Sequence, residues 1–138
     1  MPGLQDLPGQ QQLIVAVPGQ ATAATPDEFV LATMPFNGTV TSVSYLPKST
    51  VTGAATNFLS VTCRNRGPAG AGATNVAQLD YSSGAVVTTA FAPGAVTLNA
   101  TAANRNFSAG DVLTCEKLVA GTGLAMPAGT VIVNYTVR

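Results

Sequence analysis

The 138-residue sequence contains no histidine and no tryptophan, and only 9% of its residues are charged. Without histidine the chain cannot form the Ser-His or Cys-His pairs that activate most side-chain nucleophiles. Its two cysteines form no Cys-x-x-Cys pair, so the usual spacing of a zinc site is missing. We therefore expect no catalytic residue, no metal ion and no cofactor.

Charge is scarce and balanced, with six basic and six acidic residues. The largest basic cluster is Arg64 with Arg66, whereas phosphate binding needs several basic side chains. Soluble domains usually carry about 25% charged residues. The surface must therefore consist mainly of small and uncharged polar residues, which favours close packing against other proteins. A neutral monomer that packs against nothing is the alternative.

A pair of carboxylates is the remaining candidate for a catalytic site. Asp80 with Asp111 or Glu116 could form a glycosidase-like pair across two sheets, but nothing local in the sequence supports this. Asp111 follows a glycine in a predicted turn, and Asp80 lies on the polar face of a predicted strand. We expect that the chain is not an enzyme.

Long apolar runs are also missing, since none approaches the ~20 residues of a membrane span. The first ten residues lack the basic and apolar regions of a signal peptide, so we expect synthesis and residence in a cytosol. There, Cys63 and Cys115 are expected to be buried thiols. The sequence does not determine whether the two cysteines are neighbours on facing strands.

The segment 36–66 shows the pattern that organises the chain. It predicts two strands, at 38–46 and 58–64, joined by a turn-rich excursion. In the second strand, Leu59, Val61 and Cys63 alternate with Ser60, Thr62 and Arg64, as in a strand with one buried face. Similar runs, separated by glycine and proline turns, predict further strands at 29–33, 74–81, 85–91, 96–99, 112–119 and 130–137.

About eight strands at intervals of roughly ten residues, with no amphipathic helix, predict an all-β fold. We expect a jelly-roll-like β-sandwich of about eight antiparallel strands. Only the segment 101–107 could form a short helix. Tyr45, Tyr81 and Tyr135 lie on apolar strand faces, which predicts core packing rather than an exposed platform for sugars.

Residues 1–28 differ from the rest of the chain, with four prolines, five glutamines and no aromatic residue. The prolines exclude a long helix, and only Leu13–Val17 could pair as a strand. We predict an extended Pro/Gln-rich arm over 1–28, ordered against a partner, followed by a β-sandwich domain over 29–138. A flexible tail is the alternative.

Four phrases carry a resemblance to a known family: GTVTSVSYLP (38–47), TGAATN (52–57), AGDVLT (109–114) and GTGLAMPAG (121–129). They resemble segments of the small capsid decoration, or cement, and head-associated proteins of tailed bacteriophages. The resemblance implies a structural virion protein that binds the outer face of an icosahedral shell and bridges neighbouring capsid subunits. Its implied partners are the major capsid protein and further copies of itself, as a homotrimer.

The resemblance also implies a location on the capsid surface, after synthesis in the host bacterial cytoplasm, without a nucleic-acid or membrane partner. The alternative is a head- or tail-fibre module that binds host-surface glycans. Segments that core packing explains least are the best candidates for partner contact. The predicted contact residues are Leu13, Ile14, Val15, Ala16, Val17, Lys48, Ser49, Thr50, Gly53, Pro68 and Gly70.

Overall fold

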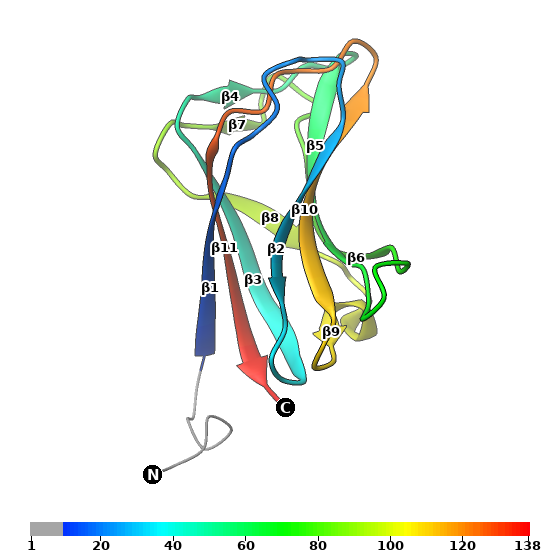
Figure 1. Ribbon diagram of the computed structural model, residues 1–138. Helices are drawn as coiled ribbons and strands as arrows, with labels where there is room; N and C mark the ends of the chain where they lie inside the picture. The colour runs from blue at the N-terminus through cyan, green and yellow to red at the C-terminus, as the bar shows by residue number, and fades with distance from the viewer. Residues whose placement is uncertain (1–9) are drawn as a thin grey trace.

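The computed structural model describes residues 10–138, which form one nearly closed antiparallel sheet and a small two-stranded one (Figure 1). Within these residues the helical structure is a single four-residue 3-10 turn, Ala102–Arg105, and no helix is long and apolar enough to cross a membrane. The predicted all-β fold is confirmed. The strands are β1 (Gln10–Val17), β2 (Asp27–Thr33), β3 (Gly38–Pro47), β4 (Val51–Thr52), β5 (Phe58–Asn65), β6 (Thr74–Asp80), β7 (Val87–Thr88), β8 (Gly94–Leu98), β9 (Asn106–Phe107), β10 (Val112–Ala120) and β11 (Gly129–Val137).

The large sheet has the strand order β1-β11-β3-β8-β6-β5-β10-β2, and β9 also pairs with β3. Strand β8 joins two layers, because Gly94 and Val96 pair with β3 while Thr97 and Leu98 pair with β6. The first layer contains β1, β11 and β3, and the second contains β6, β5, β10 and β2. β1 and β2 therefore end the path on either side of an open seam.

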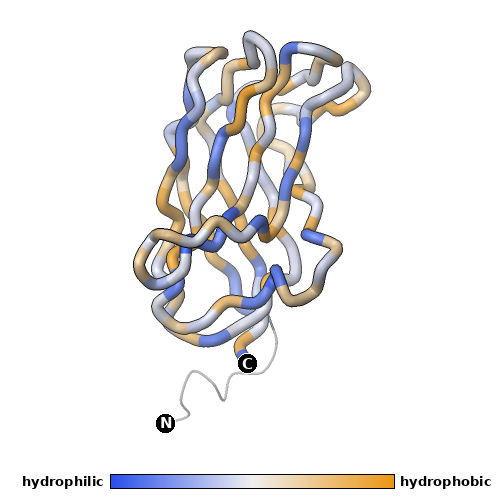
Figure 2. Tube along the Cα trace, turned by 90° about the vertical axis from the view of Figure 1, so that its right-hand side faces the viewer, coloured by the Kyte–Doolittle hydropathy of each residue, from blue (hydrophilic) through white to orange (hydrophobic). Residues whose placement is uncertain are grey.

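The core lies between these layers and follows the period-2 pattern of the strands. Figure 2 shows hydrophobic and hydrophilic residues alternating along the chain. Tyr45 and Tyr81 are fully buried, and Tyr135 packs edge-on against Phe107 with ring centroids 5.4 Å apart. The predicted apolar face of β5 is also buried. The prediction that the tyrosines serve the core rather than an exposed platform is therefore confirmed for Tyr45 and Tyr81.

Two local predictions are wrong. Ser60 and Thr62 were expected on an exposed face, but both are buried, because β5 is a central strand and the longer Glu116 and Gln78 flank Thr62 on the neighbouring strands. The strand expected at 85–91 is reduced to the two residues of β7. Turn hydrogen bonds interrupt it on both sides, from Val86 N–H to the Ser83 carbonyl and from Ala92 N–H to the Thr89 carbonyl.

Part of the predicted arm belongs to the sheet. β1 pairs with β11 along its whole length, from Gln10 opposite Thr136 to Val17 opposite Gly129. The segment is uncharged and alternates, so that Leu13 and Val15 pack against the core and Val17 is buried in it. The strand pair β1–β11 thus joins the predicted arm (1–28) to the predicted domain (29–138) in one sheet. Residues 1–9 of the predicted arm lie outside the described part of the chain.

Candidate functional site

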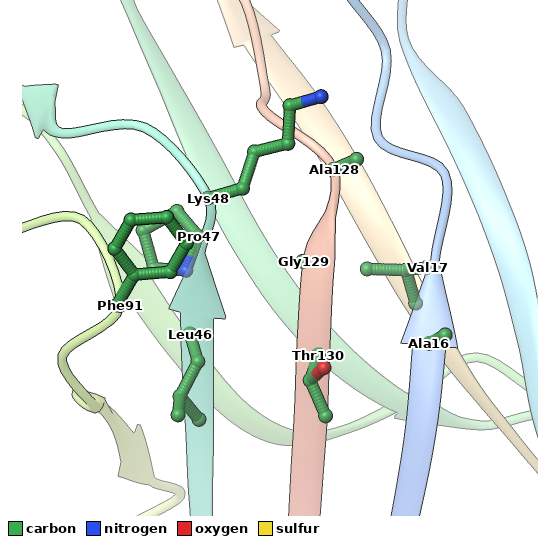
Figure 3. A pocket seen from close by; sticks show the side chains of 9 residues that line it. All are labelled: Ala16, Val17, Leu46, Pro47, Lys48, Phe91, Ala128, Gly129 and Thr130. Carbon is green, nitrogen blue, oxygen red and sulfur yellow. The ribbon is translucent and has the colours of Figure 1, made fainter.

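An apolar groove of about 420 Å³ lies where β3 ends, β11 begins and β1 ends (Figure 3). The register places Val17, Gly129 and Pro47 side by side on these three strands. Most of the lining is aliphatic or aromatic. Its residues are Ala16, Val17, Leu46, Pro47, Lys48, Phe91, Ala128, Gly129 and Thr130.

A second hollow, of about 490 Å³, adjoins the first and shares Lys48 and Ala128 with it. It is lined by the β1–β2 connection, the loop after β3 and the segment before β11. We call the two hollows together the Lys48 trough. The remaining residues of the second hollow are Pro18, Ala21, Ser49, Thr50, Ala125, Met126 and Pro127.

Backbone hydrogen bonds hold the segment before β11 against both neighbouring loops. Lys48 N–H donates to the Ala128 carbonyl at 2.8 Å, and Gln20 N–H donates to the Met126 carbonyl at 2.9 Å. The buried Tyr45 hydroxyl donates to the Pro127 carbonyl at 2.5 Å. At the floor, a Cβ on Gly129 would lie 2.0 Å from the Leu46 carbonyl oxygen, so this position needs glycine. The trough is therefore built from fixed backbone.

Phe91 stands at one side of the trough with 80% of its surface exposed. Its backbone has φ of +62°, in the left-handed region that bulky residues rarely adopt. The Phe91 N–H donates to the Pro47 carbonyl at 2.8 Å, and the Ala90 N–H donates to Thr50 Oγ1 at 3.0 Å. One hydrogen bond to the end of β3 and one to the loop after it thus hold a strained backbone and place an aromatic ring beside the groove.

Lys48 is the one charged residue that lines the trough, and it has no ion-pair partner among residues 10–138. The three neighbouring strands β1, β11 and β3 contain no charged residue at all. Their outward side chains include Ile14, which is 61% exposed. Further along, Gln12 donates to Asn134 Oδ1 at 3.1 Å and Asn134 donates to Ser42 Oγ at 2.8 Å. We call this surface the uncharged face.

The second layer, in contrast, holds an ion-pair network. Arg66 Nη2 lies 2.5 Å from Glu28 Oε1 and 3.2 Å from Glu116 Oε2, and Arg64 Nε lies 2.6 Å from Glu116 Oε1. Thr114 also donates to Glu28 Oε2 at 2.5 Å. The hydrogen bonds from Arg66 are the main reason that the pKa of Glu28 falls from 4.5 to about 2. Arg64 and Arg66 are thus paired with Glu28 and Glu116 within the molecule.

The lowered pKa predicts a loss of stability in acid. A carboxylate whose pKa is depressed in the folded state stabilises the protein above its unfolded pKa, and this contribution is lost as the pH falls through the folded value. The free energy of unfolding should therefore decline between pH 4.5 and about 2, with about 1–2 kcal/mol due to Glu28 after solvent screening. Urea unfolding of Glu28→Gln should show a shallower pH slope, and an unchanged slope would contradict the assignment.

Two cysteine thiols and a lysine ammonium group are buried inside the sandwich. Cys63 and Cys115 are directly opposite on β5 and β10, and both are buried free thiols whose pKa burial raises to about 12. The fully buried Lys117 donates to the carbonyls of Thr22 and Ala23 at 2.8 and 3.1 Å, and more weakly to that of Gln20 at 3.4 Å. Burial lowers the pKa of Lys117. These hydrogen bonds fix the β1–β2 connection, which forms one wall of the trough.

The structure brings five of the predicted contact residues to the trough: Ala16, Val17, Lys48, Ser49 and Thr50. Ile14 is exposed, whereas Leu13 and Val15 turn toward the core. The other three lie elsewhere. Gly53 packs closely on the backbone of Tyr81 and Ser83, and Pro68 and Gly70 are exposed in the β5–β6 loop, away from the trough (Figure 1).

Sequence reasoning missed Leu46, Phe91, Gly129 and Lys117. Phe91 was placed in a strand, although the Pro93-Gly94 pair that follows it signals a turn. Lys117 shares the alternation of Leu113 and Cys115, which would have placed it inside. Among residues 10–138 no group of three or more His, Cys, Asp or Glu side chains could hold a metal ion. Comparison with known proteins found no matching family model, no matching curated protein and no matching solved structure.

Proposed function

We propose that this chain is a structural protein that decorates the outer surface of a tailed-bacteriophage capsid and bridges neighbouring capsid subunits. The observation that carries the proposal is the uncharged face of β1, β11 and β3, which ends in the Lys48 trough. The class of partner comes from the resemblance of the turn and strand phrases to decoration proteins. The implied partners are the major capsid protein and further copies of this chain.

An uncharged face suits this role for an energetic reason. Burying an unpaired charge in an interface is expensive, whereas apolar side chains and mutually hydrogen-bonded amides lose little on leaving water. Ile14 offers apolar area, and Gln12, Asn134 and Ser42 are linked by two hydrogen bonds within the face. In the second layer, Arg64 and Arg66 are already paired with Glu28 and Glu116 within the molecule, so these four charges offer little attraction to a partner.

Binding to a shell of repeated subunits would raise the affinity above that of a single contact. A protein that meets two neighbouring capsid subunits binds the second contact within one complex, which raises the overall affinity without a stronger single contact. The pinned loops and the continuous sheet would hold the two contacts at a fixed separation. We propose that the protein thereby resists the separation of shell subunits.

Glycan binding by a fibre module is the second candidate, and exposed Phe91 is the observation that favours it. Sugar sites combine such an aromatic ring with several hydrogen-bonding side chains. In the groove beside Phe91, the polar side chains are those of Lys48 and Thr130. The groove therefore fits an apolar partner better than a glycan.

The proposal is tested by adding the purified protein to phage particles that lack it. We expect saturable binding to the shell and a higher temperature of shell disruption, measured by release of packaged DNA. Particles that neither bind the protein nor gain stability would contradict the proposal, and binding to host-surface glycans instead would favour the second candidate.

A further inference from the structure

The Lys48 trough combines two properties that together define the chemistry of an occupant. Its floor and walls are mainly apolar, from Val17, Leu46 and Pro47 to Phe91. Its single cation, Lys48, lies where the two hollows meet and has no counter-ion among the described residues. An occupant that buries apolar side chains on both sides of one carboxylate would complement this arrangement.

Phe91 supplies an independent indication of a ligand. A glycine would adopt its positive φ without strain, yet this position carries an exposed phenylalanine held by two hydrogen bonds. Strained backbone of this kind is found preferentially at functional sites, where the surrounding structure holds it in place. Because 80% of Phe91 is exposed, its ring is not part of the hydrophobic core. Its position beside the groove therefore fits contact with an occupant.

The form of the trough favours an extended chain over a small molecule. The two hollows share Lys48 and Ala128, and both are open to solvent rather than closed around a compact ligand. Figure 3 shows the lining residues of the first hollow spread over three strand ends. The lining of the first hollow runs across the ends of three neighbouring strands, from Phe91 beside β3 to Ala16 on β1, so an occupant must extend across them to contact all of them.

We infer that the Lys48 trough binds an extended, mainly apolar peptide segment of a partner protein, with an Asp or Glu carboxylate against the Lys48 ammonium and an apolar side chain against Phe91. The identity of that partner as the shell subunit rests on the proposed function. The chemistry of the occupant does not, because it follows from the trough.

The test is a selection from a displayed library of random heptapeptides on the immobilised protein, followed by affinity measurements on the enriched peptides. We expect sequences that combine apolar residues with an Asp or Glu. Replacing that acid by its amide, or Lys48→Gln in the protein, should weaken binding about fivefold, as for an exposed ion pair, and the two changes together should weaken it no further. The effect should shrink as salt is raised.

Phe91→Gly is the matched variant, because it removes the ring and also relieves the backbone strain. It should unfold at the same temperature as the original protein or a higher one, yet bind the peptides at least about tenfold more weakly. Val30→Ala, at an exposed position on β2, should leave peptide binding unchanged.

Three results would overturn the inference: no enrichment on the original protein, enriched peptides without an acid, or equal binding by Phe91→Gly. Failure of the proposed function looks different. In that case the peptides still bind the trough, while the protein does not bind phage particles. If the protein binds particles and the Phe91→Gly and Lys48→Gln variants bind them equally well, the proposed function stands and the trough is not the site of contact.

Discussion

Lys117→Ala should lower the free energy of unfolding by about 3 kcal/mol, because it empties a fully buried position and removes the donor of three hydrogen bonds. The loss should concentrate in the β1–β2 connection, whose carbonyls accept those bonds. Hydrogen exchange should therefore show faster exchange of backbone amides around Gln20, where the connection meets Met126. Urea unfolding gives the size of the effect.

Lys117→Met separates the two causes. Methionine restores most of the buried volume but leaves the carbonyls of Gln20, Thr22 and Ala23 without their ammonium donor. We expect Lys117→Met to recover about half of the unfolding free energy that Lys117→Ala loses. The remaining loss of about 1–2 kcal/mol would be due to the missing hydrogen bonds. If Lys117→Met is as stable as the original protein, the ammonium contributes nothing and the connection is held by its other contacts.

Ile14→Lys should abolish binding to phage particles, with a loss of at least about a hundredfold in affinity. The substitution would place an unpaired charge in the contact that we propose for the uncharged face, and burying such a charge costs several kcal/mol. The isolated protein should hardly change, since Ile14 is 61% exposed and surface substitutions usually alter stability by less than about 0.5 kcal/mol. Co-sedimentation with particles that lack the protein measures the effect.

Val30→Lys is the matched control for this variant. Val30 is also a β-branched residue on a strand at the end of the sheet path, and it is 68% exposed, but it lies on β2 in the charged layer. Val30→Lys should bind particles normally. Equal binding by both lysine variants would show that the uncharged face is not the contact surface, and loss in Val30→Lys alone would assign contact to the other layer.

The strands were predictable from the sequence because alternation and turn chemistry are local. In β5, the pattern of Leu59, Val61 and Cys63 indicated the buried face correctly. The same pattern could not show that Thr62 on the other face would be covered by Glu116 and Gln78, because that depends on which strands become its neighbours.

The trough was not predictable for a similar reason. Its floor exists only because the register aligns Val17, Gly129 and Pro47, which are distant in the sequence. Phe91 joins it through a hydrogen bond to the Pro47 carbonyl, and nothing in the alternating segment around Phe91 signals that bond. Lys48 was predicted as a contact residue because it begins a loop, not because the sequence revealed the groove.

The lack of charge on the uncharged face is visible in the sequence only after the strand order is known. β1 and β11 pair although most of the chain lies between them, and β3 completes the surface from the other side of β11. Each of these strands alone is an ordinary uncharged segment. Their adjacency creates a continuous surface that the amino-acid composition only suggested.

The number of copies of this protein per phage particle tests the proposed decoration of the shell most directly. Quantitative mass spectrometry of purified particles, and of particles saturated with added protein, measures it against the major capsid protein. Decoration of an icosahedral shell predicts hundreds of copies, in a fixed ratio to the capsid subunits. A handful of copies would indicate a fibre or tail component, and absence from the particle would contradict the account.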